Sequence, residues 1–181
     1  MGGLIRRIHL SAVKFDLDRK YKYTNGNPFI GKPGGFWYGI NDAWLDWCDT
    51  EMPDWIRPHV YELDINPSDI LTIQTLADFD KFEQKYVYHH DPEVENYPYL
   101  IESVDWKEVA RHYPGIEINP YFWEKRFNSK GNWYCGWDMA SGVIWDVSVI
   151  RNISYIAEIK DRKNWRNQFH GLRLLTEGTE E

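Results

Sequence analysis

Long apolar runs are absent from this sequence, and so is any excess of positive charge. No stretch approaches the roughly 20 apolar residues of a membrane-spanning helix, and the start of the chain has an arginine pair but no apolar run of signal-peptide length. We therefore expect neither a membrane partner nor export. The 28 acidic residues outnumber the 21 basic ones, for a formal net charge of -7. Nucleic acid is accordingly the less favoured partner, because binding a phosphate backbone requires positive charge.

Cysteine is also scarce, with only Cys48 and Cys135 in the chain. Two cysteines give neither a disulfide framework nor zinc-ligand spacing, so a reducing, cytoplasmic location and no metal are expected. His89, His90 and Asp91 are better explained by a solvated loop than by a metal site, because no further ligand has helix or strand spacing to them. The sequence also lacks a P-loop, a dinucleotide-binding glycine fingerprint and a nucleophile elbow.

Aromatic side chains are what the sequence has in quantity: 10 Trp, 12 Tyr and 8 Phe, or 17% of its residues. Rings at helical or strand spacing usually pack in a core. Tyr61, Phe79, Phe82 and Trp106 fit that structural role. Composition by itself does not divide the other rings between core and site.

One α+β domain is predicted from the length and the apolar pattern. It is expected to cover residues 1–175, with a disordered acidic tail at 176–181. Alternation through His59–Ile65 indicates a half-buried strand, and Asp105 with Glu108 would cap a helix. Further strands are expected at 4–10, 70–73, 116–118, 143–147 and 153–159, and helices at 41–51, 79–86 and 105–113.

Three segments fit a purely structural role less well. In Ile8–Ser11, a His and a Ser lie two residues apart on an expected strand and so on one face, although a structural histidine explains them as simply. In Gly31–Gly39, a glycine-rich turn leads into an aromatic run. That pattern is typical of a hairpin before a core strand, or of a backbone that approaches a flat ligand closely. Trp133–Asp146 mixes three tryptophans and two aspartates with small residues, which favours a pocket.

In order along the chain, the three segments resemble the ADP-ribosyltransferase superfamily, in its diphtheria-toxin-like and poly(ADP-ribose)-polymerase-like branch. That branch opens with a strand bearing His, then Gly, then Ser or Thr, and Ile8–Ser11 takes this place with Leu where the family has Gly. A G-[IF]-Y-[FS] strand and an aromatic helix are similar to Gly35–Tyr38 and Ala43–Cys48. The last motif, E-Y-I-V-Y-D, is similar to Ser141–Asp146.

The resemblance implies a split antiparallel β-sandwich of ADP-ribosyltransferase type with short helices. It also implies NAD as substrate, used for ADP-ribosyl transfer or for NAD glycohydrolysis. The groove would be formed by His9, the Gly34–Tyr38 strand and the Trp133–Asp146 segment. The acceptor is open, with a protein or a small molecule favoured over nucleic acid.

Roles for single residues follow from the same resemblance. His9 would anchor the ribose and Trp37 would stack on nicotinamide. The catalytic Glu of the family aligns with Ser141, so the charge beside the developing cation is assigned to Asp138. Catalytic roles are thus implied for His9, Trp37, Asp138 and Ser141. Cofactor contacts are implied for His9, Ser11, Gly35, Trp37, Tyr38, Trp47 and Trp137.

Two alternatives stay open because the family's Glu is replaced. One is a non-catalytic nucleotide- or protein-binding module on the same fold. The other is an aromatic-rich sugar- or protein-interaction domain, which predicts several exposed tryptophans on one surface. Of the ten tryptophans, we expect only Trp37, with Trp133 or Trp137, to contact a ligand.

Overall fold

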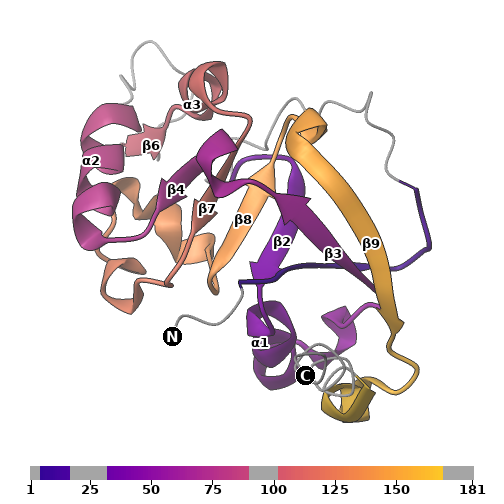
Figure 1. Cartoon of the computed structure of the whole chain (residues 1–181). Coiled ribbons are helices and arrows are strands. Elements are labelled where there is room, and N and C mark those ends of the chain that lie inside the picture. Colours follow the sequence, from indigo (N-terminus) through magenta and orange to yellow (C-terminus); the bar gives the residue numbers. More distant parts are fainter. Residues whose placement is uncertain (1–4, 17–31, 90–101, 169–181) are drawn as a thin grey trace, which may run out of the picture.

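Seven strands form one mixed sheet in the computed structural model, which describes residues 5–16, 32–89 and 102–168 (Figure 1). The order across this sheet is β4-β7-β8-β2-β1-β3-β9, and β5 pairs separately with β6. The strands of the large sheet are β1 (Arg7–Ser11), β2 (Phe36–Ile40), β3 (His59–Ile65), β4 (Leu71–Ile73), β7 (Gly115–Ile118), β8 (Ser141–Ile144) and β9 (Ile150–Glu158). The other elements are β5 (Val87–His89), β6 (Glu102–Val104), α1 (Ala43–Glu51), α2 (Leu76–Tyr86) and α3 (Trp106–His112), with short 3-10 turns between them. The described residues form a single α+β domain, as the sequence predicts. The expected tail at 176–181 lies outside them.

Local sequence signals account for several of these elements. Strand β3 has the predicted bounds and buries Tyr61, Leu63 and Ile65 on one face. Helix α3 begins where its cap was predicted, since the carboxylate of Asp105 accepts a 2.9 Å hydrogen bond from the backbone N–H of Glu108. Alternation and capping involve only neighbouring residues, which is why they can be read from the sequence.

Several expected elements have different bounds, and polar side chains account for two of the differences. The helix expected at 41–51 begins at Ala43, because Asn41 has a positive φ of 53° and its side chain accepts a hydrogen bond from the backbone N–H of Arg6. The strand expected at 143–147 ends earlier, because the carboxylate of Asp146 accepts from the N–H of Ser148 and starts a 3-10 turn. The start of α1 and the end of β8 are thus each set by a polar side chain that accepts a hydrogen bond from a backbone N–H.

The large sheet splits between the neighbouring strands β1 and β2. Strands β1 and β2 pair only at Arg7–Ile40 and Ile8–Gly39. Beyond that point β1 pairs with β3 and β2 pairs with β8. The sheet therefore divides into a β4-β7-β8-β2 half and a β1-β3-β9 half (Figure 1). It is mixed, which corrects the expectation of antiparallel strands throughout: β4 runs parallel to β7, because the chain between them makes a long crossover through α2 and α3.

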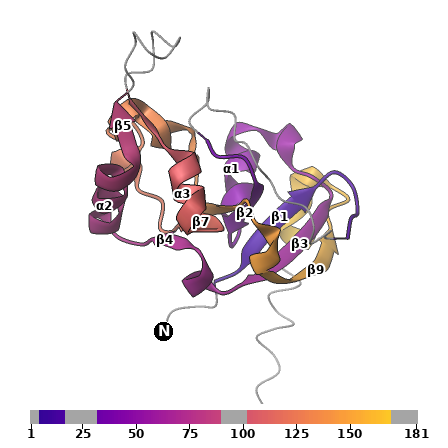
Figure 2. The same cartoon turned by 90° about the horizontal axis from the view of Figure 1, so that it is seen from above.

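Strand alternation gives the sheet two different faces. Figure 2 shows α1, α2 and α3 on the same side of the strands, where Ile8 packs under α1 and Val143 packs with residues of α2 and α3. The opposite face carries Phe36 and Tyr38, which pack with Leu63 and other residues of β3, β8 and β9. The two halves of the sheet thus close on each other along the face that has no helix.

Candidate functional site

The split between β1 and β2 opens into a cavity of about 360 Å³. Its lining residues are His9, Ser11, Phe15, Gly35, Phe36 and Trp37. On β2 the pairing with β1 reaches only to Gly39, two residues after Trp37 in the sequence, so the two strands diverge alongside Trp37 and leave room for the cavity. Four of the predicted site residues, His9, Ser11, Gly35 and Trp37, therefore line one space although they come from two separate segments.

His9 is held in one orientation by both halves of the split. Its Nδ1 lies 2.7 Å from the backbone carbonyl oxygen of Trp37, and its ring stacks on Phe36 at 4.1 Å between centroids. Burial lowers the pKa of this imidazole below its ordinary value, which favours the neutral form. A carbonyl only accepts hydrogen bonds, so Nδ1 carries the proton and Nε2 is left as an acceptor.

Gly35 brings backbone close to the cavity. A Cβ at this position would lie 2.6 Å from the carbonyl oxygen of Ile144, so a larger residue would push β2 away from β8. Ser11 lies at the other end of the lining, where its hydroxyl donates a 2.7 Å hydrogen bond to the carbonyl of Val13. The glycine at position 35 is thus required by the contact with β8, in agreement with the structural alternative of a turn before a core strand.

Trp37 is half-buried and lies between packed rings and a charged group. The ring of Trp137 meets it edge-on at 4.9 Å, and the ammonium of Lys32 lies 5.3 Å from its ring centroid. Trp137 is itself fully buried, so it supports Trp37 from behind and lines neither cavity. Trp133 is also buried, and its indole N–H donates to Glu83. Of the three tryptophans expected to contact a ligand, only Trp37 has a surface available for one.

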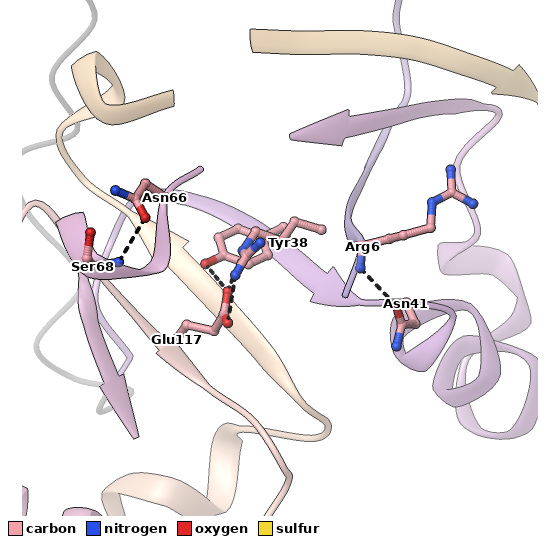
Figure 3. Close-up of polar contacts among 7 residues, drawn as sticks. Arg6, Tyr38, Asn41, Asn66, Ser68 and Glu117 are labelled. Atoms are coloured by element: carbon pink, nitrogen blue, oxygen red, sulfur yellow. Dashed lines mark hydrogen bonds and ion pairs between the residues drawn. The ribbon is translucent and has the colours of Figure 1, made fainter. Parts of the chain in front are cut away.

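Tyr38 belongs to the interior of the sheet. It is 3% exposed, and its hydroxyl donates a 2.9 Å hydrogen bond to Glu117 (Figure 3), whose carboxylate also accepts from Arg7 at 2.7 Å. The Tyr38 ring lies over Gly142, where an added Cβ would come within 2.3 Å of it. Tyr38, predicted to contact the cofactor, therefore occupies the face of β2 opposite Trp37 and packs in the core.

Ser141, which the sequence resemblance aligns with a catalytic Glu, is buried in β8. It is 4% exposed, and its hydroxyl donates a 3.0 Å hydrogen bond to the carbonyl of Met139. It lies opposite Gly39 in the β2–β8 ladder, on the same face as Trp37. It carries no charge and does not line the cavity at the split.

Asp138 and Trp47 line a second cavity, of about 400 Å³, between α1 and the segments after β7 and before β8. The carboxylate of Asp138 is shared by two cations, Arg126 at 3.2 Å and Lys32 at 3.7 Å. Trp47 stacks on Trp44 at 5.1 Å. The structure thus distributes the predicted groove over two cavities and part of the core.

Several residues near the two cavities were missed by sequence reasoning. Phe15 lines the first cavity and Tyr121 and Trp123 line the second, while Lys32 and Arg126 flank Asp138. Lys32 lies inside the glycine-rich segment that the sequence singled out, so it could have been found. Phe15, Tyr121, Trp123 and Arg126 lie outside the α-helices and strands, so no local pattern in the sequence indicates that they are near a cavity.

Tryptophan exposure bears on the alternative of an interaction domain with tryptophan platforms. Only Trp55 (46%) and Trp123 (68%) are exposed, and all ten tryptophans fall within the described residues. The remaining eight are buried or half-buried. This distribution does not match a surface built from several exposed tryptophans.

No protein-family model, curated protein or solved structure matches this chain. In the described part of the chain, no helix is both long and apolar enough to cross a membrane, and no three His, Cys, Asp or Glu residues gather as metal ligands would.

Proposed function

We propose that this chain binds NAD or a related nucleotide in the cavity at the split between β1 and β2. The observation that carries the proposal is the meeting of His9, Ser11, Gly35 and Trp37 around one space. The acceptor Nε2 of His9 suits a ribose hydroxyl. The half-buried ring of Trp37 points to the opposite face of β2 from Phe36, so it suits a flat nicotinamide that reaches between the diverging strand ends. A cavity of about 360 Å³ is in the usual range for a small ligand.

The arrangement of the strands supports an ADP-ribosyltransferase type of fold. The three segments that carry the resemblance lie on adjacent strands, since β2 pairs with β1 on one side and with β8 on the other. Strand β2 leads into α1, and β8 is followed by β9, in the order that the resemblance requires. A sheet that divides between β1 and β2 is consistent with the split architecture of that family.

Binding without turnover is the activity that the geometry supports best. Cleavage of the bond between nicotinamide and ribose develops positive charge on the ribose, which a nearby carboxylate would stabilise. None of the residues that line the first cavity, within the described ranges, is a carboxylate. Asp138 lines the other cavity, and its charge is compensated by Arg126 and Lys32.

ADP-ribosyl transfer to a protein or small molecule, or NAD glycohydrolysis, is the second candidate. It is the activity that the resemblance implies, although the resemblance aligns Ser141, on the strand next to β2, with the family's catalytic Glu. In that reaction the glycosidic C–N bond breaks, nicotinamide leaves with the electron pair, and an acceptor oxygen or nitrogen bonds to the ribose carbon. Asp138 would have to release Lys32 or Arg126 to stabilise the cation.

Calorimetry with NAD and ADP-ribose tests the proposal, together with an assay for released nicotinamide and labelled NAD in cell extract. We expect binding with no nicotinamide release, and an affinity at least about fivefold lower for Trp37→Leu, since stacking of one ring on a base is worth ~1–3 kcal/mol. Trp55→Leu, which removes an exposed ring outside both cavities, is the matched control. Release of nicotinamide or a labelled product would establish the second candidate instead. If neither NAD nor ADP-ribose binds, both candidate functions are refuted.

A further inference from the structure

Three aromatic rings from two parts of the chain line the second cavity. Tyr121 and Trp123, on the segment after β7, meet with their ring planes at 87° and their centroids 4.9 Å apart, so they form a corner. Trp47 contributes the third ring from α1. Tyr121 stacks on the buried Tyr134 and Trp47 stacks on Trp44, so these rings are held in place by packing. Trp123 is 68% exposed, which leaves its indole accessible to a ligand.

The charged side chains that line this cavity are carboxylates. Glu51 lies at the C-terminal end of α1, and its carboxylate makes no ion pair or hydrogen bond with another described residue. The last turn of α1 has no basic residue, and the free carbonyl groups of a helix C-terminus add partial negative charge. Asp138 is bound by Lys32 and Arg126, but neither cation lines the cavity. A ligand would therefore meet the uncompensated charge of Glu51 beside the rings.

Aromatic walls beside an unpaired carboxylate favour a cationic ligand. The face of an aromatic ring carries partial negative charge, so it attracts a cation and disfavours an anion. The guanidinium of Arg126 lies 5.7 Å from the ring centroid of Trp123 without lining the cavity, so it does not occupy the place that a ligand would take. A phosphate or carboxylate in the cavity would be repelled by Glu51, whereas a cation would be attracted by it.

The supply of hydrogen-bond acceptors narrows the class of cation. A primary ammonium or a guanidinium has several N–H donors, and each needs an acceptor when it leaves water. Among the side chains of the lining, Glu51 and Thr50 are the available acceptors, because the oxygens of Asp138 already bind two cations. Apart from the rings, the remaining lining residues are the apolar Ala43, Met139 and Ala140. A quaternary ammonium carries its charge without any N–H donor, so it suits this lining best.

We propose that the second cavity binds a quaternary ammonium group, held by the rings of Trp47, Tyr121 and Trp123 with Glu51 as its counter-ion. A cavity of about 400 Å³ has room for the methyl groups and for the chain that carries them. The group belongs to a small free cation such as choline or to the side chain of a trimethylated lysine, which share this chemistry. The site has no lining residue in common with the cavity at the split, so the proposal is independent of nucleotide binding there.

Calorimetry with choline and two analogues tests which property of the ligand is recognised. The first analogue is neutral, with a tert-butyl group in place of the trimethylammonium group, so it keeps the shape and loses the charge. The second is ethanolamine, which keeps the charge and adds N–H donors. We expect choline to bind at least about tenfold more tightly than either, in line with the strength of a desolvated cation–π contact. Equal affinities for choline and the neutral analogue would refute a cation site, and tighter binding of ethanolamine would refute selection of a quaternary ammonium.

Substitutions of the cavity lining test where choline binds. Trp123→Leu should weaken choline binding at least about fivefold. Glu51→Gln should weaken it about threefold, make it less sensitive to salt and leave the affinity for the neutral analogue unchanged. Tyr88→Leu on β5 and Glu158→Gln on β9 remove an exposed ring and an exposed carboxylate outside both cavities, and both should bind choline as wild type does. If Trp123→Leu and Glu51→Gln keep the melting temperature and the choline affinity of wild type, the proposal is refuted.

A glycine peptide that contains one trimethyllysine distinguishes the two sources of the ligand. An affinity for this peptide at least about tenfold above that for choline would assign the cavity to a methylated protein side chain, because the lysine stem and the flanking backbone then add contacts. An affinity equal to or below that for choline would assign it to a small free cation. The same peptide with unmodified lysine is the control and should bind more weakly than the methylated one. If neither choline nor the methylated peptide binds, the proposal is refuted.

Discussion

Tyr38 and Glu117, 79 residues apart in the sequence, are joined by a 2.9 Å hydrogen bond inside the sheet (Figure 3). The same carboxylate accepts from Arg7 through two nitrogens, at 2.7 and 3.1 Å. Arg7 belongs to β1, whereas Tyr38 and Glu117 belong to β2 and β7 in the other half of the sheet. This buried group therefore ties the two halves together at the end where β1 and β2 still pair.

Removal of the Glu117 carboxylate should destabilise the fold strongly. Glu117→Ala leaves the guanidinium of Arg7 buried without its partner, and we expect a loss of about 3–5 kcal/mol in the free energy of unfolding. Urea denaturation followed by fluorescence measures the loss. Glu108→Ala, which removes an exposed carboxylate on α3, serves as control and should change stability little. Equal effects of the two substitutions would show that the buried group does not hold the sheet together.

Tyr38→Phe separates the structural role of Tyr38 from its predicted contact with a ligand. The substitution keeps the ring over Gly142 and removes only the hydroxyl, so it should cost about 1 kcal/mol of stability. Nucleotide affinity should stay as in wild type, because the hydroxyl faces Glu117. A large change in affinity at unchanged stability would instead assign Tyr38 to the site.

Gly142 should tolerate no side chain. In Gly142→Ala the new methyl would lie 2.3 Å from the ring of Tyr38, and overpacking of this kind costs about 1–3 kcal/mol. Gly136→Ala is the control, because its Cβ would meet only the flexible end of Lys32 at 3.0 Å. Thermal unfolding of both variants provides the comparison. Similar melting temperatures for the two would contradict the close contact between β8 and Tyr38.

His9 should make the stability of the protein depend on pH below neutrality. Its pKa is lowered by burial in the folded state, whereas the unfolded chain has the ordinary value of about 6.5. The unfolded state then binds more protons between these two values, so stability falls as the pH falls through that window. His9→Asn keeps a donor near the carbonyl of Trp37 but does not titrate. Urea midpoints at pH 7 and pH 5 should therefore differ less in His9→Asn, and an equal difference would exclude His9 as the cause.

The two cysteines should differ sharply in reactivity. Cys135 is exposed, whereas Cys48 is fully buried and burial raises the pKa of its thiol to about 12. Only the thiolate reacts with alkylating reagents, so one thiol per chain should be modified rapidly at pH 8 and the second only after denaturation. Mass spectrometry of peptides after labelling identifies the site. Rapid modification of Cys48 in the native protein would show that the core under α1 opens.

Much of the secondary structure was predictable because it depends on neighbouring residues. The alternation in His59–Ile65 and the cap at Asp105 were recognised without any tertiary information. The short strands Val87–His89 and Glu102–Val104 were missed, since neither has the pair of isoleucines that marks the equally short segments 70–73 and 116–118. The register and splitting of the large sheet depend on partners distant in sequence.

The candidate site was predicted in part. His9 and Trp37 were placed together because their motifs resemble a known family, and they line one cavity. Tyr38 was assigned to a ligand because it adjoins Trp37 in the sequence. On a strand, however, neighbouring side chains point to opposite faces, and the face that is buried depends on which strands pair. Ser141 is buried for another reason: β8 lies between β7 and β2, and all four of its residues are buried.

Sequence alone determined the α+β class, the local bounds of several elements and four of the residues that line the split, His9, Ser11, Gly35 and Trp37. Tertiary structure decided which rings are accessible and which charges are compensated. Asp138 illustrates the difference: its carboxylate was expected to be available for catalysis, but Lys32 and Arg126 converge on it from other parts of the chain. Burial and ion pairing depend on the distances between segments far apart in sequence, and only the folded chain sets those distances.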